Sequence, residues 1–307
     1  ASGVVAVARL QTRVENAQAS LDTYYNENFN ARAEIVGDDP EDYTDIKYGN
    51  HDAAGVNNDH GTHVAGLIGA SRGNGLGMDG VADNVLIMTL RAVPDGDERD
   101  KDVANAVRYA ADNGAKIINM SFGKGYSPGK PAVDAAFLYA ESKGVLIFHS
   151  AGNSSKDNDL GNNFPNRHVK ATPGRKIRTW IEVGASASLK GENLPAVFSN
   201  YGQKDVDLFS PGVRVNSTTP NNTYAAFSGT SMAGPVAAGV AALVLSQKPE
   251  MTAVALRSEI MATTRKYDGL VVRLPGSDPI QGVLFSRLSL TGGIVDAYNV
   301  LKKVLAK

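Results

Sequence analysis

Residues 116–149 read KIINMSFGKGYSPGKPAVDAAFLYAESKGVLIFH and alternate apolar and amphipathic segments. The apolar runs 116–122 and 145–149 are short and bounded by glycine, which is typical of buried strands. The intervening segment 131–142 has the composition and spacing of a helix. A strand, a helix and a second strand in this order predict a β-α-β unit with parallel strands.

The same pattern extends in both directions from this unit. Upstream, NVLIMTLRAV at 84–93 predicts a buried strand, and residues 102–113 predict a helix that Gly114 stops. Two successive β-α-β units predict an α/β fold with a doubly wound, mostly parallel sheet and helices on both faces. Downstream, residues 175–230 form a region of short β-rich runs and turns. Three helical segments follow, at 235–247, 252–264 and 293–307. In the last segment, Ile294, Tyr298, Leu301 and Leu305 recur at helical spacing. We expect this helix to pack on the outside of the fold through these residues.

Composition excludes several classes of protein. A chain of 307 residues with 42% hydrophobic and 21% charged residues can bury a large core. A net charge of −1 gives no electrostatic reason to expect a nucleic-acid partner. The longest near-apolar stretch, 236–245, is shorter than the roughly 20 residues of a membrane span. Cysteine is absent, which excludes thiolate nucleophiles and cysteine zinc sites.

The first 25 residues carry apolar side chains at three- and four-residue steps, which predicts an amphipathic helix. They lack a basic segment followed by an apolar core, so no signal peptide is expected within this sequence. We expect a single domain over 1–307, with residues 51–307 as its core. The apolar positions of the expected helix are Val7, Leu10, Val14, Ala17, Leu21 and Tyr24.

Three glycine-flanked polar motifs are candidate sites for chemistry. The first, NDHGTHVAG at 58–66, places His60 at the start of a small apolar helix, where the helix dipole favours a neutral imidazole. The second, SAGNS at 150–154, follows the strand 145–149, so Asn153 can donate to a developing oxyanion. In the third, SGTSMAGPVAAG at 228–239, Ser231 stands at a helix N-terminus that is followed by three turns of small residues.

Each motif also has a structural interpretation. A lone histidine is more often a core or capping residue, Gly-Asn is an ordinary turn, and Ser231 could serve only as an N-cap. A metal site that pairs His60 with His63 lacks the glutamate of a zincin motif and an evident third ligand. The small residues after Ser231 favour a helix that packs closely on all sides and holds its first turn rigidly.

His60, Asn153 and Ser231 follow in this order, 93 and 78 residues apart, and the chain thereby resembles the subtilisin-like serine protease family, the subtilases. The resemblance covers roughly residue 24 to the end. It is carried by HGTHVAG at 60–66, INMSFG at 118–123, SAGN at 150–153, FSNYG at 198–202, FSPGV at 209–213 and GTSMAGPVAAG at 229–239.

The resemblance implies a serine endopeptidase that works through an acyl-enzyme. Ser231 is then the nucleophile, His60 the general base, and Asn153 the oxyanion donor together with the backbone N–H of Ser231. The substrate would pair with the segment Ser121, Phe122 and Gly123, and Gly152 would lie near the primary specificity pocket. Polypeptides are therefore the expected partners, with no nucleic acid and no membrane.

The third member of the family's triad is missing. In the family, an Asp at the end of the first strand, inside a D-[ST]-G motif, orients the histidine, and no such motif precedes His60. Val4–Ala8 resembles that strand but is followed by Arg9. Other aspartates lie on the predicted helix or too close to His60, namely Asp22, Asp52 and Asp59.

Two accounts of the missing Asp compete. In the favoured one, residues 24–49 are the tail of an insertion, and a missing N-terminal segment of the same protein carries the Asp. In the other, the Asp has been lost, and the chain is a crippled relative or a non-catalytic peptide-binding module. Either way, we expect residues 1–307 alone to be nearly inactive and marginally stable.

Cofactor and compartment are weaker inferences. The family often binds calcium, for which the loop 73–77 and the acidic cluster 95–102 are candidates, although the cluster is more simply a solvated helix N-terminus. No cofactor is required by the chemistry. An α/β metallohydrolase using His60, His63 and the acidic cluster ranks last. The resemblance suggests a secreted or extracytoplasmic bacterial enzyme.

Overall fold

The computed structural model describes residues 2–22, 25–30, 32–55, 58–93, 98–161, 163–187 and 191–306. They form two compact units, Ala1–His51 and Asp52–Lys307. In the first unit, helix α1 spans Ser2–Asp22 and a π-helix, η1, spans Arg32–Val36. Helix α1 confirms the expected N-terminal helix, while Tyr24, the last residue of its expected apolar face, lies outside the described residues.

The second unit is built on a six-stranded sheet with the strand order β1-β2-β3-β4-β10-β7. All neighbouring pairs are parallel except β10 and β7, which are antiparallel. This sheet confirms the predicted α/β class. The strands are β1 Ile117–Met120, β2 Leu146–Ser150, β3 Trp180–Ser186, β4 Leu208–Pro211, β10 Gly293–Ile294 and β7 Arg265–Lys266.

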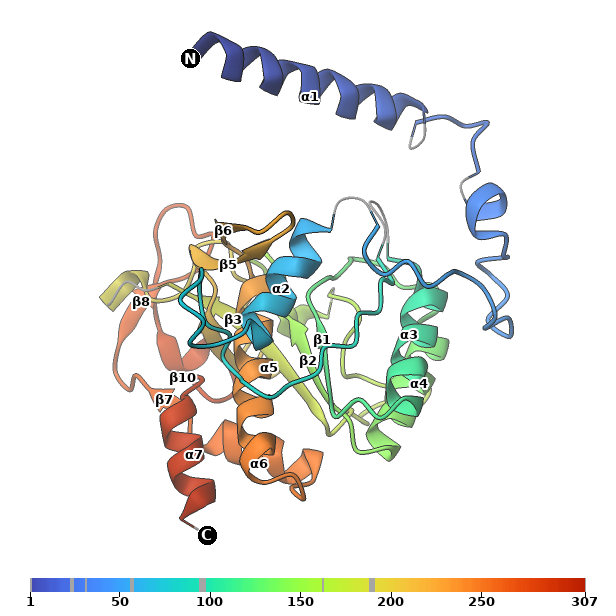
Figure 1. Cartoon of the computed structure of the whole chain (residues 1–307). Helices are drawn as coiled ribbons and strands as arrows, with labels where there is room; N and C mark the ends of the chain where they lie inside the picture. The colour runs from blue at the N-terminus through green and yellow to red at the C-terminus, as the bar shows by residue number, and fades with distance from the viewer. Residues whose placement is uncertain are drawn as a thin grey trace. The chain divides into compact units, whose positions relative to one another are not determined.

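Helices and two hairpins complete this unit (Figure 1). The helices are α2 Asp59–Gly69, α3 Asp100–Asp112, α4 Lys130–Ser142, α5 Thr230–Gln247, α6 Ala253–Ala262 and α7 Ala297–Leu305. The hairpins are β5 Val215–Thr219 with β6 Thr223–Phe227, and β8 Val271–Arg273 with β9 Gly282–Leu284. Short 3₁₀ turns are η2 Asn158–Leu160, η3 Gly191–Asn193 and η4 Phe285–Arg287.

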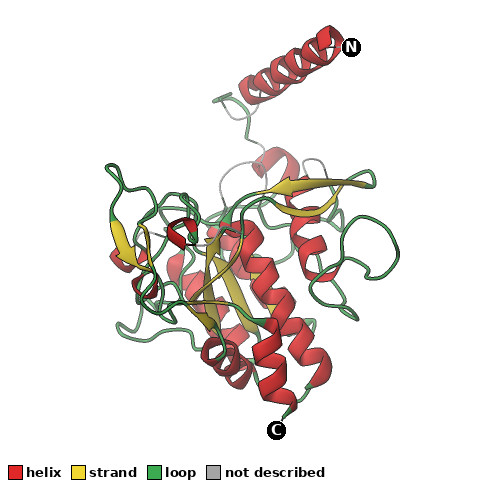
Figure 2. Cartoon of the chain, turned by 90° about the vertical axis from the view of Figure 1, so that its left-hand side faces the viewer, coloured by secondary structure: helices red, strands yellow, loops and turns green. Residues whose placement is uncertain are grey.

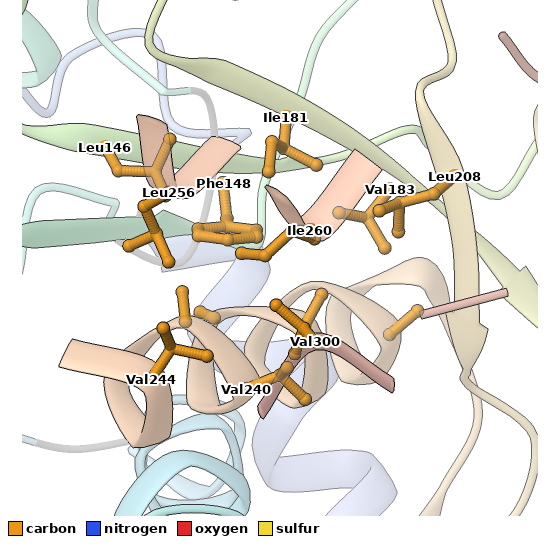
Figure 3. Packing of buried hydrophobic residues seen from close by; sticks show 14 of the residues in the cluster. Leu146, Phe148, Ile181, Val183, Leu208, Val240, Val244, Leu256, Ile260 and Val300 are labelled. Carbon is orange, nitrogen blue, oxygen red and sulfur yellow. The ribbon is translucent and has the colours of Figure 1, made fainter. Parts of the chain in front are cut away.

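Side chains alternate along the central strands and fill a core on each face of the sheet, with helices on both sides (Figure 2). Leu146 and Phe148 of β2 pack into a cluster with helices α5, α6 and α7, drawn in Figure 3. Ile147 of the same strand packs with Trp180 in the opposite cluster, against α3 and α4. The sheet is therefore covered on both faces, as its near-continuous apolar strands require.

Helix α5 is the central helix of this fold. By length and composition it is apolar enough to cross a membrane, but 61% of it is buried inside the protein, as expected for a core helix. Glycines let it approach its neighbours closely. A Cβ on Gly239 would lie 2.7 Å from Cβ of Val81, and one on Gly234 would lie 2.9 Å from Oγ of Ser150.

The buried strand predicted at 84–93 was wrong. These residues form no strand, and the side chain of Leu86 is fully exposed. A strand needs a hydrogen-bonded neighbour, and among the described residues β1 is the edge of the sheet, with its outer side unpaired. An apolar sequence alone could not show that this neighbour is absent.

The face predicted for the C-terminal helix was also partly wrong. Tyr298 and Leu305 are exposed, whereas Val300 and Val304 are buried, each 1% exposed. Both faces carry apolar side chains at four-residue spacing, so the periodicity did not distinguish them. The predicted packing of this helix against the core is confirmed, through Val300 and Val304.

The close packing of α5 gives a stability prediction. Gly239→Ala should lower the free energy of unfolding by about 1–3 kcal/mol, because the new methyl group overlaps Val81. Gly61→Ala in α2 is the matched control, because a Cβ there meets nothing within 4 Å. That change should raise stability by about 0.4–1 kcal/mol. Urea unfolding followed by fluorescence of Trp180, the single tryptophan, measures both, and equal effects would contradict the packing argument.

Candidate active site

Ser231 is joined to Ser121 by two hydrogen bonds. It is the second residue of α5, which begins at Thr230, ahead of the predicted start at Pro235. Because Pro235 has no N–H, the carbonyl of Ser231, four residues earlier, lacks its helical donor. The Ser121 hydroxyl donates to that carbonyl at 2.9 Å, and the Ser231 hydroxyl donates to the Ser121 carbonyl at 3.3 Å. The candidate nucleophile therefore lies beside the first residue of the expected substrate-pairing segment.

Asn153 is fixed by Thr230. Its Oδ1 accepts hydrogen bonds from the backbone N–H of Thr230 at 2.8 Å and from the Thr230 hydroxyl at 2.9 Å. Both bonds use the amide oxygen, so the Nδ2 group is left as a donor. A Cβ placed on Gly229 would lie 3.5 Å from Asn153 Nδ2 and 3.6 Å from the Ser231 nitrogen. Two N–H donors thus border one small space, the arrangement that stabilises an oxyanion.

Gly152 lies where a side chain would not fit. Its φ is +104°, and a Cβ there would lie 2.6 Å from Nδ2 of Asn200. Asn200, from the FSNYG motif, accepts hydrogen bonds from the N–H groups of Ser154 and Lys156 at 2.9 and 3.0 Å. The motif therefore braces the loop after β2. Thr230 and Asn200 were missed as site residues, although both stood inside motifs that the sequence displayed.

His60 lies in the first turn of α2, which packs beside α5 and the β5–β6 hairpin (Figure 1). Its side chain is exposed, and within the described part of the chain its ring makes no hydrogen bond to Ser231 or to a carboxylate. Desolvation by the surrounding protein lowers the pKa of His60 below 6.5; nearby Asp59 opposes this shift, and His63 adds to it. This direction favours the neutral imidazole that a general base requires.

His63 has a core role. It is fully buried, its ring stacks on Phe227 with a centroid distance of 4.3 Å, and its Nε2 lies 3.0 Å from the carbonyl oxygen of Ala225. Burial also lowers the pKa of His63. The described residues contain no group of three His, Cys, Asp or Glu side chains that could hold a metal ion.

Two carboxylates in or near the candidate calcium segments have partners within the protein. Asp79 accepts a hydrogen bond from the N–H of Gly73, and Asp100 forms an ion pair with Lys124 at 2.9 Å. Asp95 and Asp97 lie outside the described residues.

Two of the three aspartates considered for the triad accept hydrogen bonds from neighbouring residues. Asp22 accepts a hydrogen bond from Gln18 in α1, and Asp52 accepts from the N–H groups of Ala54 and Gly55. Asp59 is exposed in the first turn of α2.

A large apolar cavity lies along the open edge of β1. Its volume is about 830 Å³, and Asn119 at its wall has a buried Oδ1 without a hydrogen-bond partner among the described residues. Residues 84–90, which failed to form a strand, line its other side. Apolar lining also comes from α2, α3, β1 and α5, including Ala65, Ile68, Val103, Val107, Ile118, Met120 and Ala238.

Comparisons with known proteins identify the family of the chain. The model of the subtilase family (Peptidase S8) matches residues 3–283. Alkaline elastase YaB from Bacillus sp. (strain YaB) is 39% identical over 207 residues, which cover 67% of this chain and 50% of that protein. Thermitase from Thermoactinomyces vulgaris is 37% identical over 213 residues, or 69% of each chain. A solved cold adapted subtilisin-like serine proteinase superposes with a TM-score of 0.57 at 34% identity, over 68% of each chain.

The chain spans about half the length of alkaline elastase YaB and 70% of subtilisin DY from Bacillus licheniformis, to which it is 36% identical. The family match covers most of the sequence, including helix α1. On this similarity, the chain belongs to the subtilase family of serine peptidases.

Proposed function

We propose that this chain is a serine endopeptidase in which Ser231 is the nucleophile, His60 the general base, and Asn153 with the Ser231 N–H the oxyanion donors, all within a catalytic core at 51–307. The observation that carries the proposal is the space beside Gly229, bordered by Asn153 Nδ2 and the Ser231 nitrogen. A helix cap alone does not require a second, rigidly held amide donor beside the serine.

The reaction follows from these groups. Ser231 Oγ attacks the peptide carbonyl while His60 takes the hydroxyl proton. The carbonyl oxygen becomes an oxyanion, which the Asn153 amide and the Ser231 N–H stabilise by hydrogen bonds. His60 then returns the proton to the leaving amine, and the acyl group stays on Ser231. Water next attacks the acyl carbon while His60 takes its proton, and Ser231 leaves with the proton that His60 gives back. Before attack, the Ser231 hydroxyl must turn from the Ser121 carbonyl toward His60.

The carboxylate that orients His60 is proposed to come from a further strand of the same protein, added to the open edge of β1. The apolar cavity of about 830 Å³ and the unpaired residues 84–90 support this account. The family match from residue 3 supports the other account, because it includes Val4–Ala8 followed by Arg9 in place of an Asp. In that case the chain is a crippled relative.

A second candidate function is a non-catalytic peptide-binding module. It is favoured by the hydrogen bond that the Ser231 hydroxyl makes to Ser121 in place of His60. Under either function we propose polypeptide partners that pair with Ser121, Phe122 and Gly123, with Gly152 near the primary specificity pocket, and a secreted or extracytoplasmic bacterial location.

The rate at which a fluorophosphonate labels Ser231 distinguishes the two functions, with Ser231→Ala as the blank. In subtilisin, removal of the triad Asp lowers kcat by about 3 × 10⁴. We therefore expect specific labelling of Ser231 that is slower by about 10³–10⁵ than in a subtilase with a complete triad. Fast labelling would contradict the prediction that this chain alone lacks a carboxylate that orients His60. Absence of labelling would favour the binding module.

Gly229→Ala tests the oxyanion space. The residue has extended backbone, with φ of 162° and ψ of 161°, and an added Cβ meets nothing closer than 3.5 Å, so the fold should be unaffected. The methyl group would occupy the space between the two donors. Labelling of Ser231 should fall by about 10²-fold, the effect of losing one oxyanion donor. Gly125→Ala, where a Cβ meets nothing within 4 Å, should label as the parent does.

The pH profile of labelling tests His60. Only the neutral imidazole accepts the proton of Ser231, so the rate should fall as the pH drops through the pKa of His60. Because desolvation lowers that pKa, the midpoint should lie below 6.5. A midpoint above 6.5 would contradict the lowered pKa of His60.

A further inference from the structure

His149 is a buried histidine that the proposed reaction does not use. It lies in β2 and has no exposed surface. Its ring centroid is 5.3 Å from that of Trp180, and the ring of Phe122 meets it edge-on at 6.4 Å. It therefore lies under the segment that we propose to pair with substrate.

Both ring nitrogens of His149 are hydrogen-bonded. Nδ1 lies 2.9 and 3.0 Å from the two carboxyl oxygens of Glu182, and Nε2 lies 2.8 Å from the carbonyl oxygen of Phe122. A carbonyl oxygen only accepts, so Nε2 must carry a proton. This holds whether the proton between His149 and Glu182 is on Nδ1 or on the Glu182 carboxyl group.

Glu182 is itself held in place. Its Oε2 accepts a hydrogen bond from the indole N–H of Trp180 at 2.8 Å, and its Oε1 lies 3.4 Å from Nδ2 of Asn163. Its backbone N–H donates to Asp207 at 2.7 Å. The carboxyl group thus fixes the tautomer and the orientation of the His149 ring, as a carboxylate does for a catalytic histidine.

The bond from His149 decides which way the neighbouring backbone faces. In an extended segment, the backbone polar groups of successive residues point to opposite sides. Phe122 points its carbonyl at His149, and Lys124 exchanges two hydrogen bonds with Phe164 at 2.8 and 2.9 Å. Phe122 and Lys124 therefore face inward. Gly123 between them, and Ser121 on the other side of Phe122, then face the opposite way, where the Ser121 carbonyl accepts a hydrogen bond from the Ser231 hydroxyl.

We propose that His149 is a positioning residue for peptide binding. Its Nε2–H, oriented by Glu182, takes the place of a neighbouring strand at Phe122 and so presents Ser121 and Gly123 to the backbone of an extended polypeptide. This inference rests on the proposed function, because it assigns a role within the same binding edge.

Peptide binding to variants in a Ser231→Ala background tests the role without requiring turnover. His149→Gln keeps an amide donor near the position of Nε2, whereas the shorter His149→Asn places its donor only near Nδ1. With fluorescein-labelled oxidised insulin B chain, anisotropy should show that His149→Asn weakens Kd by about 10- to 100-fold, the effect of losing one buried hydrogen bond. His149→Gln should restore the affinity to within about threefold of Ser231→Ala alone.

The outcomes separate this inference from the proposed function. Unchanged binding by His149→Asn, or equal losses in both variants with intact folding by Trp180 fluorescence, would overturn the role of His149. Absence of binding by Ser231→Ala alone would instead count against the proposed function.

The unmutated chain provides a measurement that does not depend on the variants folding. In ¹⁵N-histidine-labelled protein, NMR should show Nε2 of His149 protonated, with a slowly exchanging proton coupled to it. An unprotonated Nε2 would overturn the proposal, whatever the binding data show.

Discussion

The hydrogen bonds of Thr230 are the constraint on which the candidate site depends. This residue is 1% exposed and is the first residue of α5, hydrogen-bonded to the loop that follows β2. Its N–H and hydroxyl hold Asn153, its Oγ1 accepts from the N–H of Gly152 at 3.1 Å, and its carbonyl accepts from Ser150 at 2.8 Å. One buried threonine thus fixes the loop after β2 to the helix that carries Ser231. The donors around the oxyanion space are placed by the fold and need no ligand to assemble them.

This constraint is possible only because α5 is built from small residues. Gly234 lets the helix approach Ser150 and Asn119 so closely that a Cβ would lie 2.9 and 3.1 Å from their polar atoms. Gly212 allows the same approach on the other side, where a Cβ would lie 2.7 Å from the carbonyl oxygen of Gly229. The small residues after Ser231 therefore allow the close packing that the site requires. This explains why the central helix of the core is apolar and has small side chains.

The sequence predicted those parts of the structure that depend on local pattern. The β-α-β unit at 116–149 and the helix at 102–113 could be anticipated, because strands and helix stops leave local signals. The strand at 84–93 could not be excluded, because its failure depends on a missing neighbour. Thr230 and His149 were missed for a related reason. Their partners lie 77 residues away at Asn153 and 33 residues away at Glu182, and no local pattern marks such contacts.

The two halves of the site differ in what supports them. Ser231 is hydrogen-bonded to Ser121, and Asn153 is hydrogen-bonded to Thr230 at the start of α5, so the fold itself holds the groups proposed to bind and polarise a carbonyl. His60 lies on α2, beside the apolar cavity at the edge of β1, and no carboxylate in the described residues is bonded to it. A strand added at that edge would fill the cavity, pair with β1 and cover residues 84–90 at the same time. On the proposed account, completion of the sheet and orientation of His60 are one step, so stability and activity should be gained together.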